Sequence, residues 1–193
     1  LLYNYFKQLF AQVTNPPLDA IREKLVTSLE TTAGSEGNLF AETPEQCRLL
    51  CLHQPIVTNR QLCQIKELDQ PGLKSHTISI LCNPSEGSAG MERRLDEIFA
   101  EAESAIEKGA TLLVLSDRGV DRNHMAIPAL LATSGLHQHL VREEKRTQVG
   151  IILESGEPRE CHHFCVLAAY GVCAINPYLA FETIEDMILE GMI

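Results

Sequence analysis

The residues of this chain with the most evident chemical potential follow short apolar segments. Residues 112–115 read LLVL and lead directly into the motif SDRG at 116–119, and residues 148–153 read QVGIIL and lead into Glu154 and Ser155. An aspartate beside an arginine can act as a general acid next to an anion clamp. Such a pair also commonly closes a loop through a salt bridge or caps the next helix. The motif alone leaves these interpretations open.

The seven cysteines include two pairs with i, i+4 spacing, Cys47/Cys51 and Cys161/Cys165. On a helix, each pair would share a face and could hold a metal ion together with other ligands. Cysteine is also among the residue types most often buried as a free thiol. An odd number of cysteines without a secretory signal indicates a reducing compartment. We therefore expect buried free thiols, with a metal site as the alternative.

Two further patterns could carry chemistry. His162 and His163 fall in the first turns of an expected helix, where one could act as a base or a ligand. A neutral, hydrogen-bonded histidine is the alternative, because positive charge is disfavoured at a helix N-terminus. Residues 87–90, which read GSAG, could cradle a phosphate with backbone N–H groups. They match neither a Walker motif nor GxGxxG, so a flexible connection is the simpler interpretation.

The elements that would position these residues alternate regularly along the second part of the chain. From Met91, apolar residues recur at offsets 4, 7, 8, 11, 14 and 15, which is the period of a helix. Strands are expected over 76–82, 111–115, 148–153 and 172–175, and helices over 91–108, 127–143, 159–170 and 179–189. Repeated strand–helix units with uniformly apolar strands predict a parallel sheet with helical crossovers.

The sequence therefore predicts an α/β fold, a single domain with a parallel sheet of βα repeats. The chain is too short for an eight-unit barrel of about 250 residues. An incomplete (half) TIM-barrel-like sheet and a flavodoxin-like sheet both fit. Within the single unit 1–193, we expect residues 1–72 to be a mainly helical entry segment and residues 73–193 to form the βα-repeat core.

Parallel strands end at one edge of the sheet, so the loops that follow them should lie together there. This carboxyl edge is the expected place for the polar residues that follow each strand. The candidate residues of the edge are Ser116, Asp117, Arg118, Glu154, Ser155, His162, His163 and Asn176.

Composition limits the classes of partner. The chain has 193 residues, 45 % of them hydrophobic and 22 % charged, with a formal net charge of −10. This acidic balance gives no electrostatic footprint for nucleic acid or for an anionic membrane surface. Apolar runs stay well below the roughly 18 residues that a bilayer-spanning helix requires. We therefore expect neither nucleic acid nor a membrane as a partner.

Several long strings of the sequence resemble the central domain of glutamate synthase. They are QVTNPPLDAIREKLVTSLE (12–30), LLVLSDRGVD (112–121), AIPALLATSGLHQHL (126–140) and HHFCVLAAYGVCAINPYLAFETIEDM (162–187), in the expected order. The resemblance implies a parent enzyme in which a glutamine amidotransferase domain releases ammonia. The ammonia crosses a channel to a domain with FMN and an iron–sulfur cluster, where the imine formed with 2-oxoglutarate is reduced to glutamate.

The resemblance implies that this domain connects the other two, helps position the ammonia channel and is inactive alone. The family's catalytic cysteine does not map onto Leu1, and its cluster ligands belong to the flavin domain. We therefore expect no catalytic, cofactor-binding or metal residues here, and interpret the candidate edge residues as an interdomain rim. The expected partners are the amidotransferase and FMN-binding domains of the same polypeptide, in the cytoplasm or the plastid stroma. Ferredoxin and a pyridine nucleotide both remain open as electron donor.

The alternative is a self-contained barrel-like enzyme, or a ligand-binding module, for a phosphorylated small molecule. It requires a phosphate site at 87–90 or near Ser155-Gly156.

The connecting role also predicts apolar patches that neighbouring domains normally cover, so the isolated fragment could self-associate. The expected patch residues are Leu1, Leu2, Tyr3, Tyr5, Phe6, Tyr178 and Phe181.

Overall fold

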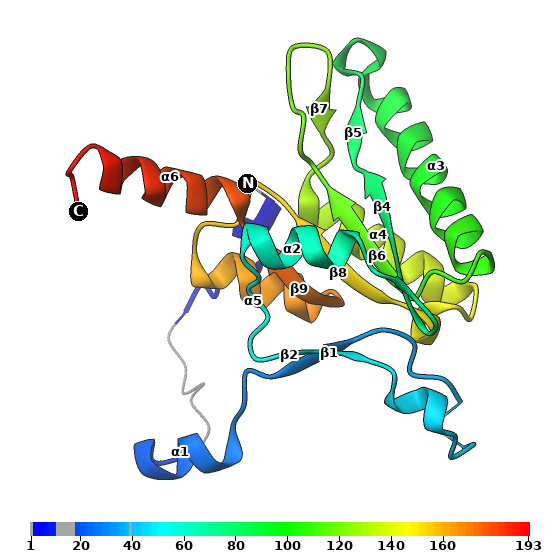
Figure 1. Ribbon diagram of the computed structural model, residues 1–193. Coiled ribbons are helices and arrows are strands. Elements are labelled where there is room, and N and C mark those ends of the chain that lie inside the picture. Colours follow the sequence, from blue (N-terminus) through cyan, green and yellow to red (C-terminus); the bar gives the residue numbers. More distant parts are fainter. Residues whose placement is uncertain (1, 11–17, 39) are drawn as a thin grey trace.

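The computed structural model describes residues 2–10, 18–38 and 40–193, and its centre is a five-stranded sheet (Figure 1). The strand order is β3-β4-β6-β8-β9, with β4, β6, β8 and β9 parallel and β3 antiparallel to β4. The strands span Asp69–Gln70 (β3), Leu73–Ser79 (β4), Leu112–Ser116 (β6), Gly150–Glu154 (β8) and Val172–Asn176 (β9). All residues of β6 and β8 are buried, including the apolar runs 112–115 and 151–153 that predicted buried strands.

A helix follows each parallel strand. These are α3 (Gly87–Glu107), α4 (Ala129–Arg142), α5 (Cys161–Ala169) and α6 (Tyr178–Leu189). The predicted α/β fold with βα repeats is confirmed. The parallel strands lie side by side in the order in which they occur along the chain, without the reversal of a flavodoxin-like sheet. This order favours the half-barrel alternative, and the sheet stays open.

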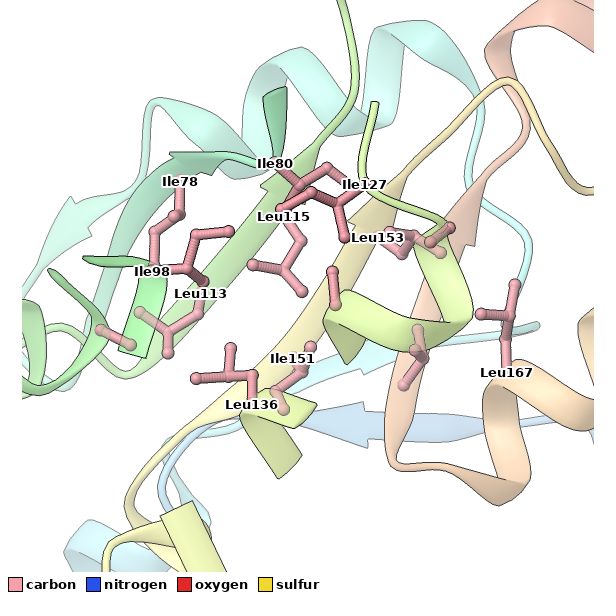
Figure 2. Packing of buried hydrophobic residues seen from close by; sticks show 14 of the residues in the cluster. Ile78, Ile80, Ile98, Leu113, Leu115, Ile127, Leu136, Ile151, Leu153 and Leu167 are labelled. Atoms are coloured by element: carbon pink, nitrogen blue, oxygen red, sulfur yellow. The ribbon is translucent and has the colours of Figure 1, made fainter. Parts of the chain in front are cut away.

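The two faces of the sheet carry separate hydrophobic cores, because side chains alternate along each strand. Leu113 and Leu115 of β6, with Ile151 and Leu153 of β8, pack toward the crossover helices (Figure 2). The neighbouring side chains of the same strands, such as Val114 and Ile152, belong to the second core.

The second face is covered by the early part of the chain. Helix α2 (Asn59–Lys66) contributes Leu62 and Ile65, and Ala33 of β1 (Thr31–Ala33) joins them. Strand β1 pairs antiparallel with β2 (Leu50–Leu52). In a closed barrel this face would line the interior. Here α2 and the β1–β2 pair bury it.

The segment 1–72 therefore does more than was expected of a mainly helical entry. Besides α2, its described part holds α1 (Ala20–Val26) and the 3-10 turns η1 (Leu2–Phe6) and η2 (Pro44–Cys47), together with β1, β2 and β3. The chain's division at residues 72 and 73 stays a prediction. Among the expected patch residues, Tyr5 and Phe6 are exposed, but Tyr3 is fully buried. The expectation of an exposed Tyr3 was wrong, because its ring stacks on His163; Leu1 lies outside the described residues.

The strand expected over 76–82 divides in two. After β4, the chain leaves the sheet and β5 (Leu81–Cys82) pairs antiparallel with β7 (Met125–Ala126). These two strands project beyond the end of the sheet, close to the start of α3 (Figure 1). The 3-10 turn η3 (Pro84–Glu86) precedes α3, and η4 (Arg146–Gln148) precedes β8.

The close approach of β1 to β8 can be tested at Gly150. A Cβ atom there would lie 2.7 Å from the backbone nitrogen of Gly34 and 2.8 Å from Ala33 Cβ. Gly150→Ala should therefore lower the free energy of unfolding by about 2 kcal/mol or more, because backbone must move. Urea unfolding followed by circular dichroism measures this.

Gly135→Ala is the matched control. Its Cβ would meet only the end of the Phe99 ring, at 3.1 Å, and Gly135 lies inside α4. The gain in helix propensity of about 1 kcal/mol should offset this contact. Equal losses in the two variants would contradict the packing of β1 on β8.

Candidate functional site: a polar network at the carboxyl edge

The buried Glu154 carboxylate is the centre of the carboxyl edge. It ends β8, and its side chain is only 4 % exposed. Ser116 Oγ donates to Oε2 at 2.5 Å, Lys66 Nζ donates to the same oxygen at 2.5 Å, and Arg118 Nε donates to Oε1 at 2.8 Å. Burial alone would raise the pKa of Glu154, but these hydrogen bonds and the Lys66 charge outweigh it and hold that pKa below its ordinary value.

Arg118 connects this carboxylate to the last helix. Its Nη2 donates to Glu182 Oε1 at 3.0 Å, and its guanidinium lies 4.1 Å from the centroid of the Tyr178 ring. Both partners belong to α6. The edge therefore ties α2, through Lys66, and α6, through Arg118, to the same carboxylate of the sheet.

Asp117 forms a second buried contact between the loops. Ser155 Oγ donates to Oδ2 at 2.6 Å, and the Gly156 backbone N–H points at both carboxylate oxygens, with nitrogen–oxygen distances of 3.1 and 3.2 Å. Burial raises the pKa of Asp117, although the hydrogen bonds from Ser155 and Gly156 oppose it. The same side chain is thus held by the loop after β8, not by its neighbour Arg118.

Asn176, at the end of β9, fastens the start of α2. Its Nδ2 donates to the Val57 carbonyl and to Asn59 Oδ1, each at 2.9 Å, and its own carbonyl accepts from Ser155 N at 3.0 Å. Along the free side of β9, the last strand of the sheet, Ile175 N donates to the Pro55 carbonyl and Val57 N donates to the Ile175 carbonyl. Asn176 Oδ1 is buried and has no hydrogen-bond partner among the described residues.

The two histidines hold the first residues of the chain. His162 Nε2 donates to the Tyr3 carbonyl at 3.1 Å, and the Tyr3 and His163 rings stack with centroids 4.4 Å apart. His163 Nδ1 accepts from Arg159 N at 3.2 Å, and burial lowers its pKa. Both histidines are thus hydrogen-bonded, as one of the two expectations had it, and burial favours the neutral form of His163. They form a neighbouring cluster around Tyr3 rather than contacting Glu154.

Both positions proposed for a phosphate already face a carboxylate of the chain. At the start of α3, a Cβ at Gly90 would lie 2.8 Å from Glu86 Oε2, and Glu86 pairs with Arg93. At Ser155-Gly156 the Gly156 N–H already donates to the Asp117 carboxylate. A phosphate at either position would meet a negative charge at once, so the geometry gives no support to the phosphate alternative.

The thiols are more exposed than expected. Of the seven free cysteines only Cys82 is buried and Cys173 is half-buried; the others, Cys47, Cys51, Cys63, Cys161 and Cys165, are exposed. The expectation of buried thiols was wrong for these five, because they lie on outer faces of their elements or in the early segment. The described residues include no cluster of three or more His, Cys, Asp or Glu side chains that could hold a metal ion. No helix in the described ranges is both long and apolar enough to cross a membrane.

The sequence did not predict Lys66, Tyr178 or Glu182 as part of the network. Lys66 comes from a helix remote in sequence, Glu182 lies on α6, and Tyr178 was expected to lie in an apolar patch. Nearby, Glu157 accepts a hydrogen bond from Ala129 N at 3.1 Å. The available signal was Glu154 itself: a carboxylate directly after an unbroken apolar strand requires a cation or several donors. Local sequence does not say which cation supplies them.

Removing the central charge tests the network. Glu154→Gln should lower the free energy of unfolding at pH 7 by about 3 kcal/mol, because Lys66 and Arg118 lose a buried partner. Since the pKa of Glu154 is depressed in the folded chain, its stabilisation is complete above the unfolded value of 4.5 and is lost as pH falls through the folded value. The difference between wild type and variant should therefore shrink below about pH 4, as urea unfolding at both pH values would show.

Glu182→Gln is the matched control, since Glu182 binds the same Arg118 but is 44 % exposed. This variant should lower the free energy of unfolding by less than about 1 kcal/mol. Equal losses for the two variants would show that the buried carboxylate does not organise the edge.

Comparison with known proteins assigns the whole chain to a family. Residues 1–193 match the family model described as glutamate synthase central domain. The chain is 50 % identical to the NADPH glutamate synthase large chain of Bacillus subtilis over 190 residues, covering 98 % of this chain and 12 % of the relative. It is 44 % identical to the NADH glutamate synthase of Saccharomyces cerevisiae, covering 100 % and 9 %, and 39 % identical to the ferredoxin-dependent chloroplastic enzyme of Spinacia oleracea, covering 99 % and 12 %.

The chain thus spans about a tenth of the length of these relatives. The match covers every described element, including the residues of the carboxyl edge. The chain belongs to the glutamate synthase central domain family.

Proposed function

We propose that this chain is the non-catalytic central domain of a glutamate synthase, connecting a glutamine amidotransferase domain to an FMN-binding synthase domain and helping to position the ammonia channel between them. The parent reaction would transfer the amide nitrogen of glutamine reductively to 2-oxoglutarate and so form glutamate. FMN and the iron–sulfur cluster would belong to the flavin domain, in the cytoplasm or, in a plant, the plastid stroma. The names of the relatives and the small share that the chain covers support this assignment.

The observation that carries the proposal is the pairing of charges at the carboxyl edge. In enzymes with parallel sheets, the residues of this edge usually point into a substrate cavity. Here Glu154 binds Lys66, Ser116 and Arg118, and Asp117 binds Ser155 and Gly156. Groups engaged in this way fix α2 and α6 relative to the sheet. Rigid placement of outer elements is what an aligning domain needs.

Helix α6 offers a surface for a neighbouring domain. It extends away from the sheet and contains no buried residue (Figure 1). Ile184, Ile188 and Leu189 are 48 %, 56 % and 85 % exposed. Exposed apolar side chains gathered on one element mark an interaction site. In an isolated fragment the same surface would favour self-association, which stays a prediction.

Arg118→Gln in the full-length enzyme tests the aligning role. Arg118 joins Glu154 to α6, so its loss should loosen α6 without touching either reaction centre. Glutaminase activity and ammonia-dependent glutamate formation should stay within about twofold of wild type, while glutamine-dependent formation falls about tenfold, because small misplacements of reacting parts are costly.

Arg122→Gln is the control, because Arg122 is exposed on the same loop and makes no salt bridge among the described residues. It should leave all three rates unchanged. If Arg118→Gln abolished the ammonia-dependent reaction in a folded, flavin-loaded enzyme, the edge would take part in chemistry and the proposal would fail.

A further inference from the structure

Helix α5 brings two exposed thiols together on one face. Cys161 begins the helix and Cys165 lies one turn later, and both are exposed. Residues four apart on a helix lie one above the other. Burial, together with the neighbouring Cys161 thiol, raises the pKa of Cys165. The two sulfur atoms therefore stand within reach of a single ligand atom.

The paired thiols border an apolar cavity. This cavity has a volume of about 490 Å³ and lies between α5, β9 and the residues that precede α2. Its lining includes Pro55, Ile56, Phe164 and Ile175, together with both thiols, and it contains no charged side chain. A hydrocarbon group attached to a thiol-bound atom would enter an apolar environment there.

The other pair with the same spacing lacks this geometry. Cys47 ends the short turn η2, and Cys51 lies in the middle of β2. Without a common helix, the i, i+4 spacing does not place the two side chains on one face. Cys47 and Cys51 also lie outside the lining of the apolar cavity. The chain thus contains its own control for the effect of helical placement.

We propose that Cys161 and Cys165 form a dithiol site for a thiophilic ligand that carries one apolar substituent, with monoorganic trivalent arsenic as the matching chemical class. In the binding step, both S–H bonds break and two As–S bonds form. The oxygen of the R–As=O reagent leaves as water with the two thiol protons. Arsenic remains trivalent and the sulfurs are not oxidised, so no oxidant or reductant is needed. The organic substituent occupies the cavity.

Phenylarsine oxide and the full-length folded enzyme test the site. After an excess of glutathione removes singly bound reagent, mass spectrometry of the tryptic peptide that begins at Glu160 should show one phenylarsenic group bound with loss of water. Cys161→Ser and Cys165→Ser should each reduce its retention by a factor on the order of 10² or more, because the second bond forms intramolecularly. Cys173→Ser, in the same peptide, and the double variant Cys47→Ser/Cys51→Ser should retain the adduct. If the serine variants unfold at the same temperature as the wild type, their loss of the arsenic adduct does not result from misfolding.

A methylarsenic(III) reagent tests the role of the cavity. It should bind the same two thiols about tenfold more weakly than the phenyl reagent, because less apolar surface is buried. Equal retention of the two reagents would overturn the contribution of the cavity. An adduct that survives Cys161→Ser or Cys165→Ser, or none on the Glu160 peptide although Cys63 is labelled by N-ethylmaleimide, would overturn the dithiol site itself.

Discussion

A single buried carboxylate organises the edge of this domain. Glu154 ends a strand whose every residue is buried, so its charge must be satisfied within the protein. Three donors from three other places in the chain do this: Ser116 from the adjacent strand, Lys66 from α2 and Arg118 from the following loop. Lys66 and Arg118 both supply positive charge, so removing either one leaves the buried carboxylate less well compensated.

The half-barrel architecture requires contacts that hold the covering elements on the open face of the sheet. An open sheet of parallel strands exposes the face that a closed barrel would bury in its interior, and here α2 with the β1–β2 pair covers that face. Apolar packing holds α2 and the β1–β2 pair against the sheet but does little to fix their orientation, because it is non-directional. The polar contacts at the strand ends supply direction: Lys66 fixes one end of α2 through Glu154, and Asn59, at the other end, binds Asn176. Helix α2 is therefore held against the sheet at both of its ends.

Local sequence predicted the βα core well and the early segment poorly. Uniform apolar strands and the helical period from Met91 located β6, β8, β9 and the crossover helices to within a few residues. Strand polarity places the residues that end parallel strands at one edge, which accounts for Ser116, Glu154 and Asn176 there. It does not account for His162 and His163, which lie in a neighbouring cluster around Tyr3. The position of Tyr3 against His163 and the reach of Lys66 to Glu154 depend on contacts between remote segments, which no local pattern encodes. The choice between half-barrel and flavodoxin-like order likewise required the strand order itself.

The coupling between Glu154 and Lys66 is the most direct measure of this account. A double-mutant cycle with Glu154→Gln, Lys66→Met and both together, followed by urea unfolding at pH 7, isolates the pairwise free energy. We predict a coupling of about 1 kcal/mol or more, because the carboxylate is buried and the Nζ–Oε2 distance is 2.5 Å. Additive losses in the double variant would contradict the account, since the buried charge and the helix would then be held independently.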